Sequence, residues 1–186
     1  MEGAKKILQI IGAVLIIALA ARVKFDIPGT QVPFTLQSLV ILLMPIFLGK
    51  RWGSAAVLCY VLLGLAGLPI FSGGSAGLDK IWGPTGGFIV GFPIAAWVVG
   101  YLADRLRLER YSSGFVCLLV GHFVLWVPGF VWLERCGLHD ELWRILNSLI
   151  PGLLLKTVIG AGMIVLWEKW RKSNSYTRFL NSFSRS

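Results

Sequence analysis

Six apolar segments, separated by short polar or glycine-rich connections, follow one another along nearly the whole chain. We place them at residues 7–23, 38–48, 52–68, 86–103, 113–133 and 145–170. Long apolar segments bounded by basic residues are typical of membrane-spanning helices. The chain is 56% hydrophobic with a mean hydropathy of +0.74, which is rare among soluble domains. The sequence therefore predicts an all-α integral membrane protein that forms one domain over residues 1–186.

Lysine and arginine are distributed unequally between the loops on the two sides of these six segments. If the N-terminus is cytoplasmic, most of them fall in cytoplasmic loops, as the positive-inside rule requires. We therefore expect both termini in the cytoplasm, in a multi-pass protein of a bacterial or archaeal cytoplasmic membrane. The net charge of +9 then reflects topology in the lipid bilayer, and we expect no nucleic-acid partner.

The first segment has an alternative interpretation as a cleaved signal peptide. Lys5 and Lys6 would form its basic start, and Ala18-Leu19-Ala20 resembles a cleavage site.

Residues 60–88 contain the most irregular connection in the chain, a glycine-dense loop that the charge pattern places on the outer face. Glycine allows the backbone to approach a ligand closely, so this loop is expected to form a shaped surface. The proline-containing connection at residues 25–37 is expected beside it.

Lys156 is the one ionisable side chain placed well inside an apolar segment. A lysine at that depth needs a partner or a wet cavity, unless it snorkels to the interface. We expect Lys156 to neutralise an anionic ligand that enters from outside. The sequence suggests further wall and polar residues for the same pocket: Phe34, Thr35, Gln37, Tyr60, Phe71, Ser72, Gly73, Trp82, Thr85, Gly86, Phe88 and Trp126. His122 is interpreted as a hydrogen-bonded structural histidine.

The chain has no phosphate-binding loop and no motif of a metalloprotease or serine hydrolase. The three cysteines have no paired spacing, so we expect neither a metal site nor a disulfide framework. We therefore expect no enzymatic activity and no cofactor. A small membrane protein with an outer pocket and no energy source suggests a subunit of a larger machine.

Several motifs, in this order, resemble the BioY family of biotin-specific substrate-binding subunits (S components) of energy-coupling-factor transporters. They are Val-Pro-Phe-Thr-Leu-Gln at 32–37, Leu-Gly-Lys-Arg-Trp-Gly at 48–53, Leu-Pro-Ile-Phe at 68–71 and Gly-Pro-Thr-Gly-Gly-Phe at 83–88. The resemblance covers essentially the whole chain. It implies a six-helix S-component fold, capture of biotin from the outer face, and partnership with a transmembrane coupling subunit and two ATPase subunits.

The resemblance also assigns individual residues. A Pro-Gly-Asp-x-x-Lys motif of the family aligns with residues 151–156, where the lysine is Lys156 and the acid is replaced by Leu153. That acid is expected to help bind the biotin head, whereas the lysine alone would still match a carboxylate. The first helix of S components packs on the coupling subunit, which argues against its cleavage. Here a patch of small residues would serve that contact: Gly12, Ala13, Ala18, Ala20 and Ala21.

Two alternatives to biotin uptake stay open from the sequence. Leu153 allows an S component for another small amphipathic vitamin. A membrane assembly factor whose outer loops bind lipid or protein is the alternative outside transport.

Overall fold

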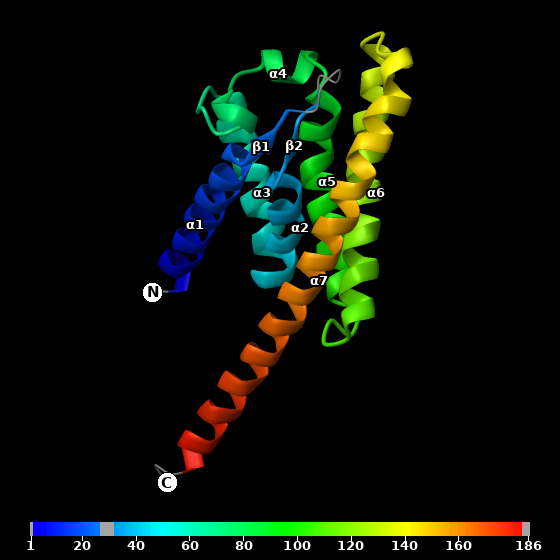
Figure 1. The fold of residues 1–186 in the computed structure, drawn as a ribbon. Helices are drawn as coiled ribbons and strands as arrows, with labels where there is room; N and C mark the ends of the chain where they lie inside the picture. Colours follow the sequence, from blue (N-terminus) through cyan, green and yellow to red (C-terminus); the bar gives the residue numbers. More distant parts are fainter. Residues whose placement is uncertain (1, 27–31, 184–186) are drawn as a thin grey trace.

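The computed structural model describes residues 2–26 and 32–183. Six helices pack beside one another, and the two ends of the chain lie on the same side of the bundle (Figure 1). They are α1 (Glu2–Arg22), α2 (Gln37–Phe47), α3 (Lys50–Leu65), α5 (Gly86–Ala103), α6 (Tyr111–Arg135) and α7 (His139–Phe183). The opposite end carries the strands β1 (Lys24–Phe25) and β2 (Phe34–Thr35), the 3₁₀ turn η1 (Ser72–Gly74) and the short helix α4 (Asp79–Trp82).

The prediction of six membrane helices is confirmed in number, although the helices differ in length. In the described part of the chain, four helices are long and apolar enough to cross a bilayer, at Gly3–Arg22, Gly86–Ala103, Tyr111–Arg135 and Leu142–Asn174. Helices α2 and α3 are shorter, with 11 and 16 residues. Gly49 joins them in a tight turn at φ 81°, a conformation that favours glycine.

The sixth predicted segment, residues 145–170, was too short. Helix α7 begins at His139 and continues to Phe183, so it extends beyond both ends of the predicted segment. Residues 171–183 include neither glycine nor proline, the two residues that most disfavour a helix, so the helix continues past the apolar segment. Helix α6 runs through Pro128 without interruption. Membrane helices tolerate proline where neighbouring groups satisfy the freed backbone.

Close helix packing depends on glycine at several contacts. A Cβ built at Gly53 of α3 would overlap the backbone of Met44 and Pro45 in α2. A Cβ at Gly87 of α5 would likewise overlap the backbone of Pro128 in α6. Small residues at such positions let two membrane helices approach closely, and Gly53 and Gly87 do so here.

Helix α1 packs on α2 and α3 and leaves a broad apolar face uncovered, with Leu8 71% and Leu19 69% exposed. The patch of small residues expected to contact a coupling subunit is not all on that face. Ala13 and Ala21 are buried against the rest of the chain, at 3% and 0% exposure. Ala18 is half-buried and packs against the core, as does Ile10. Only Gly12, whose Cβ position is open, and the half-buried Ala20 keep access to a partner.

Candidate binding site

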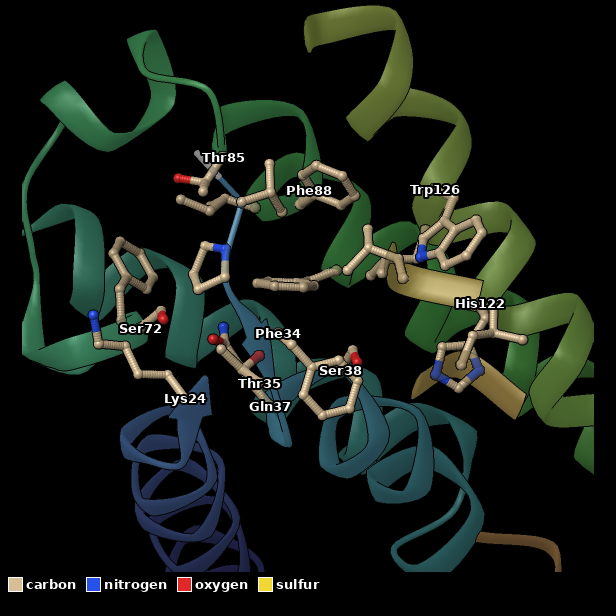
Figure 2. A pocket seen from close by; sticks show the side chains of 18 of the residues that line it. Lys24, Phe34, Thr35, Gln37, Ser38, Ser72, Thr85, Phe88, His122 and Trp126 are labelled. Carbon is tan, nitrogen blue, oxygen red and sulfur yellow. The ribbon is translucent and has the colours of Figure 1, made fainter. Parts of the chain in front are cut away.

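A cavity of about 320 Å³ lies at the end of the bundle that carries the β-hairpin and α4. Its volume falls within the range of pockets that hold small organic ligands. Most of the apolar lining is aromatic or leucine, and the polar lining comes from several elements (Figure 2). The lining residues are Lys24, Asp26, Val32, Pro33, Phe34, Thr35, Gln37, Ser38, Phe71, Ser72, Ser75, Lys80, Thr85, Phe88, Ile89, Phe92, His122, Leu125, Trp126, Leu149, Leu153 and Lys156.

The hairpin of β1 and β2 brings the segment before α2 over the cavity. Lys24 pairs with Thr35 and Phe25 with Phe34 in an antiparallel register. The backbone N–H of Leu36 also donates to the carbonyl of Val23 at 3.2 Å. These contacts fix the side chain of Phe34 near the centre of the site, as Figure 2 shows.

Lys156 of α7 is 7% exposed and lines the cavity. Its Nζ donates a hydrogen bond to Ser38 Oγ at 3.0 Å and lies 3.9 Å from the centroid of the Phe34 ring. The ring face is negative, so it stabilises the ammonium. The expectation that Lys156 would have a partner or a cavity is therefore confirmed, and the snorkelling interpretation is wrong. Gly152, one turn earlier, leaves room for the Phe34 ring, which a Cβ there would overlap.

Two polar atoms on the cavity wall have no hydrogen-bond partner within the described residues, Ser72 Oγ and His122 Nε2. Buried polar atoms are nearly always satisfied, so each is a candidate to bind a ligand. His122 is held on its other side, where Nδ1 lies 2.9 Å from the carbonyl of Leu118. The expected structural hydrogen bond of His122 is thus present, and the ring additionally faces the cavity.

The exposed rim of the cavity carries most of its charged groups. Lys24 Nζ forms an ion pair with Asp26 at 3.0 Å, and their side chains are 39% and 74% exposed. Lys80 of α4 lines the same cavity. In Figure 2, Lys24 and Ser72 lie on one side of the pocket, and His122 and Trp126 lie on the other.

The structure brings together many of the site residues expected from the sequence. Those that line the cavity are Phe34, Thr35, Gln37, Phe71, Ser72, Thr85, Phe88, Trp126 and Lys156. The other four expected residues, Tyr60, Gly73, Trp82 and Gly86, are outside the lining.

Each of these four residues lies elsewhere in the structure. Tyr60 is fully buried behind Phe71, and its hydroxyl donates to the carbonyl of Ile70 at 2.8 Å. Gly73 forms the turn of η1 at φ 66°. Trp82 is 75% exposed on the outer surface. Gly86 begins α5, where the carbonyl of Ile81 occupies the space that a Cβ would need.

Several lining residues were missed, although helical spacing could have indicated some of them. Ile89 and Phe92 share a face of α5 with the expected Phe88, and His122 and Leu125 share a face of α6 with the expected Trp126. Leu149 and Leu153 likewise share a face of α7 with the expected Lys156. Helical spacing gave no such signal for Ser38, one residue beyond the Val-Pro-Phe-Thr-Leu-Gln motif, or for Lys24 of β1 and Lys80 of α4.

One solved structure that this chain resembles is described as the S-component for biotin from an ECF-type ABC transporter. The two share 22% sequence identity with a TM-score of 0.80, over 90% of this chain and 93% of that one. This likeness establishes the fold, an S-component arrangement of membrane helices.

Relatives give a closer comparison at the level of sequence. The biotin transporter BioY of Thermotoga maritima is 43% identical over 139 residues, 73% of this chain and 80% of that protein. The biotin transporter BioY of Rhizobium etli is 34% identical over 164 residues, 83% of this chain and 88% of that protein. The family model of the BioY family matches residues 1–173. This chain is therefore a multi-pass membrane protein that belongs to the BioY family.

Proposed function

We propose that this chain captures biotin from the outer face of the membrane as the substrate-binding subunit of an energy-coupling-factor transporter. The observation that carries the proposal is the cavity. Its walls are apolar, Lys156 is a buried cation, and Ser72 Oγ and His122 Nε2 have no hydrogen-bond partner among the residues that the structure describes. Membership of the BioY family supports biotin as the ligand.

The chemistry of biotin suits such a lining. Its bicyclic ring and aliphatic chain need apolar walls, which Phe34, Phe88 and Trp126 offer. Its cyclic urea and its carboxylate need polar groups at two separate places. The cavity has cations at its rim and in its interior, so either end of the molecule finds a charged or polar partner. Biotin is here a transported ligand, and the proposal includes no cofactor.

The proposal includes partners that hydrolyse ATP. The sequence has no phosphate-binding loop, so energy for release would come from two ATPase subunits acting through a transmembrane coupling subunit. The uncovered apolar face of α1 is the surface that we assign to the coupling subunit or to lipid.

An uptake assay tests this function. A biotin auxotroph should grow on trace biotin when this chain is expressed with a coupling subunit and ATPases from a related system. The matched control replaces Lys156 by Met in the same background. Absence of uptake under every combination of subunits would contradict the proposal and would favour a role in membrane assembly.

One observation favours a second candidate ligand. Leu153 is 5% exposed and lines the cavity at the position where the family's acid is expected, so the wall has no carboxylate there. Without that carboxylate, the second candidate ligand is another small amphipathic vitamin. Competition of labelled biotin with a panel of vitamins separates the two candidates.

A further inference from the structure

His122 lines the cavity, and only one of its two ring nitrogens has a hydrogen-bond partner among the described residues. The side chain is 1% exposed on α6. Nδ1 lies 2.9 Å from the Leu118 carbonyl, one turn earlier in the same helix, and 3.4 Å from Thr157 Oγ1 of α7. Nε2 has no hydrogen-bond partner in the described part of the chain. The ring is thus fixed from behind and offers a free polar atom to the cavity.

The bond to Leu118 decides the role of that atom. A carbonyl only accepts hydrogen bonds, so Nδ1 carries a proton and donates it. In the neutral ring Nε2 then has a lone pair and acts as an acceptor. A second proton would bury an unpaired cation in the cavity that already holds the Lys156 ammonium, which is costly.

We propose that His122 Nε2 accepts a hydrogen bond from an N–H group of the ligand and so determines which end of the ligand enters this side of the cavity. The inference rests on the proposed function, biotin capture. Leu153 lines the same cavity and has no side-chain acceptor, so His122 supplies one.

The neighbouring cation defines the chemical group that fits. Lys156 lines the same cavity as His122, and its ammonium donates hydrogen bonds where His122 Nε2 accepts them. A cyclic urea carries N–H donors and a carbonyl acceptor in one ring, so it matches both. A carboxylate carries only acceptors, and the lone pair of Nε2 opposes it. The urea therefore lies at His122 and Lys156, and the carboxylate points toward Lys24 and Lys80.

This orientation differs from the one expected from the sequence, in which Lys156 neutralises a carboxylate. In the new assignment Lys156 binds the urea carbonyl, and the ion pair of Lys24 with Asp26 opens to admit the carboxylate.

The first test compares variants of His122 in purified, detergent-solubilised protein. His122→Asn keeps an amide N–H where Nδ1 stands, able to reach Leu118, and removes Nε2; His122→Gln places an oxygen acceptor near Nε2. In His122→Asn, the urea N–H of bound biotin is buried without its acceptor, so the variant should bind biotin about 5- to 150-fold more weakly. His122→Gln should restore most of the affinity. Thr157→Val, which removes the hydroxyl beside Nδ1 but leaves Nε2, is the matched control.

The ligand can be varied as well as the protein. Biotin methylated on a urea nitrogen loses the donor, so its loss of affinity should be smaller in His122→Asn than in the wild type. Biotin methyl ester loses the carboxylate charge, and its loss of affinity should be unchanged by the His122 variants. An ester penalty that disappears in His122→Asn would place the carboxylate at His122 and overturn the orientation.

The ¹⁵N resonances of the histidines give a test that leaves the cavity lining unaltered. The chain has two histidines, so ¹⁵N-histidine labelling gives few resonances, and His139→Gln leaves only those of His122. Binding of biotin should change the chemical shift of the unprotonated Nε2, as expected when its lone pair accepts a hydrogen bond. Nδ1 should stay protonated.

The outcomes separate this inference from the proposed function. Wild-type protein that binds no biotin contradicts the proposed function. Wild-type protein that binds biotin, with an unmoved Nε2 resonance and undiminished affinity in His122→Asn, overturns the role of His122 alone.

Discussion

Replacing Lys156 by Met should weaken biotin binding without destabilising the protein. Met has a similar length and no charge, so the substitution removes the ammonium and keeps the packing of the stem. Among the described residues, that ammonium donates a hydrogen bond to Ser38 and contacts the ring of Phe34. It therefore retains N–H groups for a ligand. A hydrogen bond to a charged group contributes about 1.5–3 kcal/mol, which corresponds to about a 10- to 150-fold loss of affinity.

The same substitution should leave the free energy of unfolding unchanged or raise it. The Lys156 side chain is 7% exposed, and removing a buried charge that has few partners is often neutral or stabilising. Isothermal titration with biotin and thermal unfolding in the same detergent measure the two effects on one preparation. Ser38→Ala is the matched control, since it removes the protein partner of Lys156 and keeps the cation. Unchanged affinity in Lys156→Met would refute the assignment of Lys156 to the site.

Three further outcomes test the surrounding structure. Tyr60→Phe should lower the free energy of unfolding by about 0.5–1.5 kcal/mol, because a buried hydrogen bond is lost, and should leave biotin affinity unchanged. Equilibrium unfolding and titration measure the two effects. A large loss of affinity would place the Tyr60 hydroxyl in the site. Gly152→Ala should displace the Phe34 ring and lower the free energy of unfolding by about 1–3 kcal/mol through overpacking. Gly162→Ala on the same helix has open space around the added methyl group and should be tolerated. Equal melting temperatures of the two variants would refute the contact of Gly152 with Phe34. The Lys172 ammonium holds the pKa of the exposed Glu109 carboxyl below its usual range, so the pair stabilises the fold above the unfolded pKa and the contribution disappears as pH falls through the folded pKa. Melting curves of wild type and Glu109→Gln should therefore converge at acidic pH, and a constant difference would contradict this.

Hydropathy and charge were sufficient to predict the helices, because the bilayer requires long apolar segments and places basic residues at their ends. The same argument singled out Lys156, since an isolated charge in an apolar segment needs an environment that accommodates it. The aromatic and polar residues of the preceding connection placed Phe34, Thr35 and Gln37 in the same pocket as that lysine, and the structure brings all four to one cavity.

The remaining features could not be predicted because they depend on the rotation and contacts of each helix. Helix α3 is apolar on most sides, so its pattern did not show that Tyr60 faces Phe71 instead of the cavity. The hairpin that brings Lys24 to the rim pairs only two residues on each strand, which leaves little sequence signal. The free nitrogen of His122 is visible only once the bond of the other nitrogen to Leu118 is known.

Binding of biotin to the purified chain tests the central claim most directly. Detergent-solubilised protein should bind tritiated biotin saturably at one site per chain, and an excess of other vitamins should not displace it. A chain that binds no biotin but binds another vitamin tightly would contradict the account.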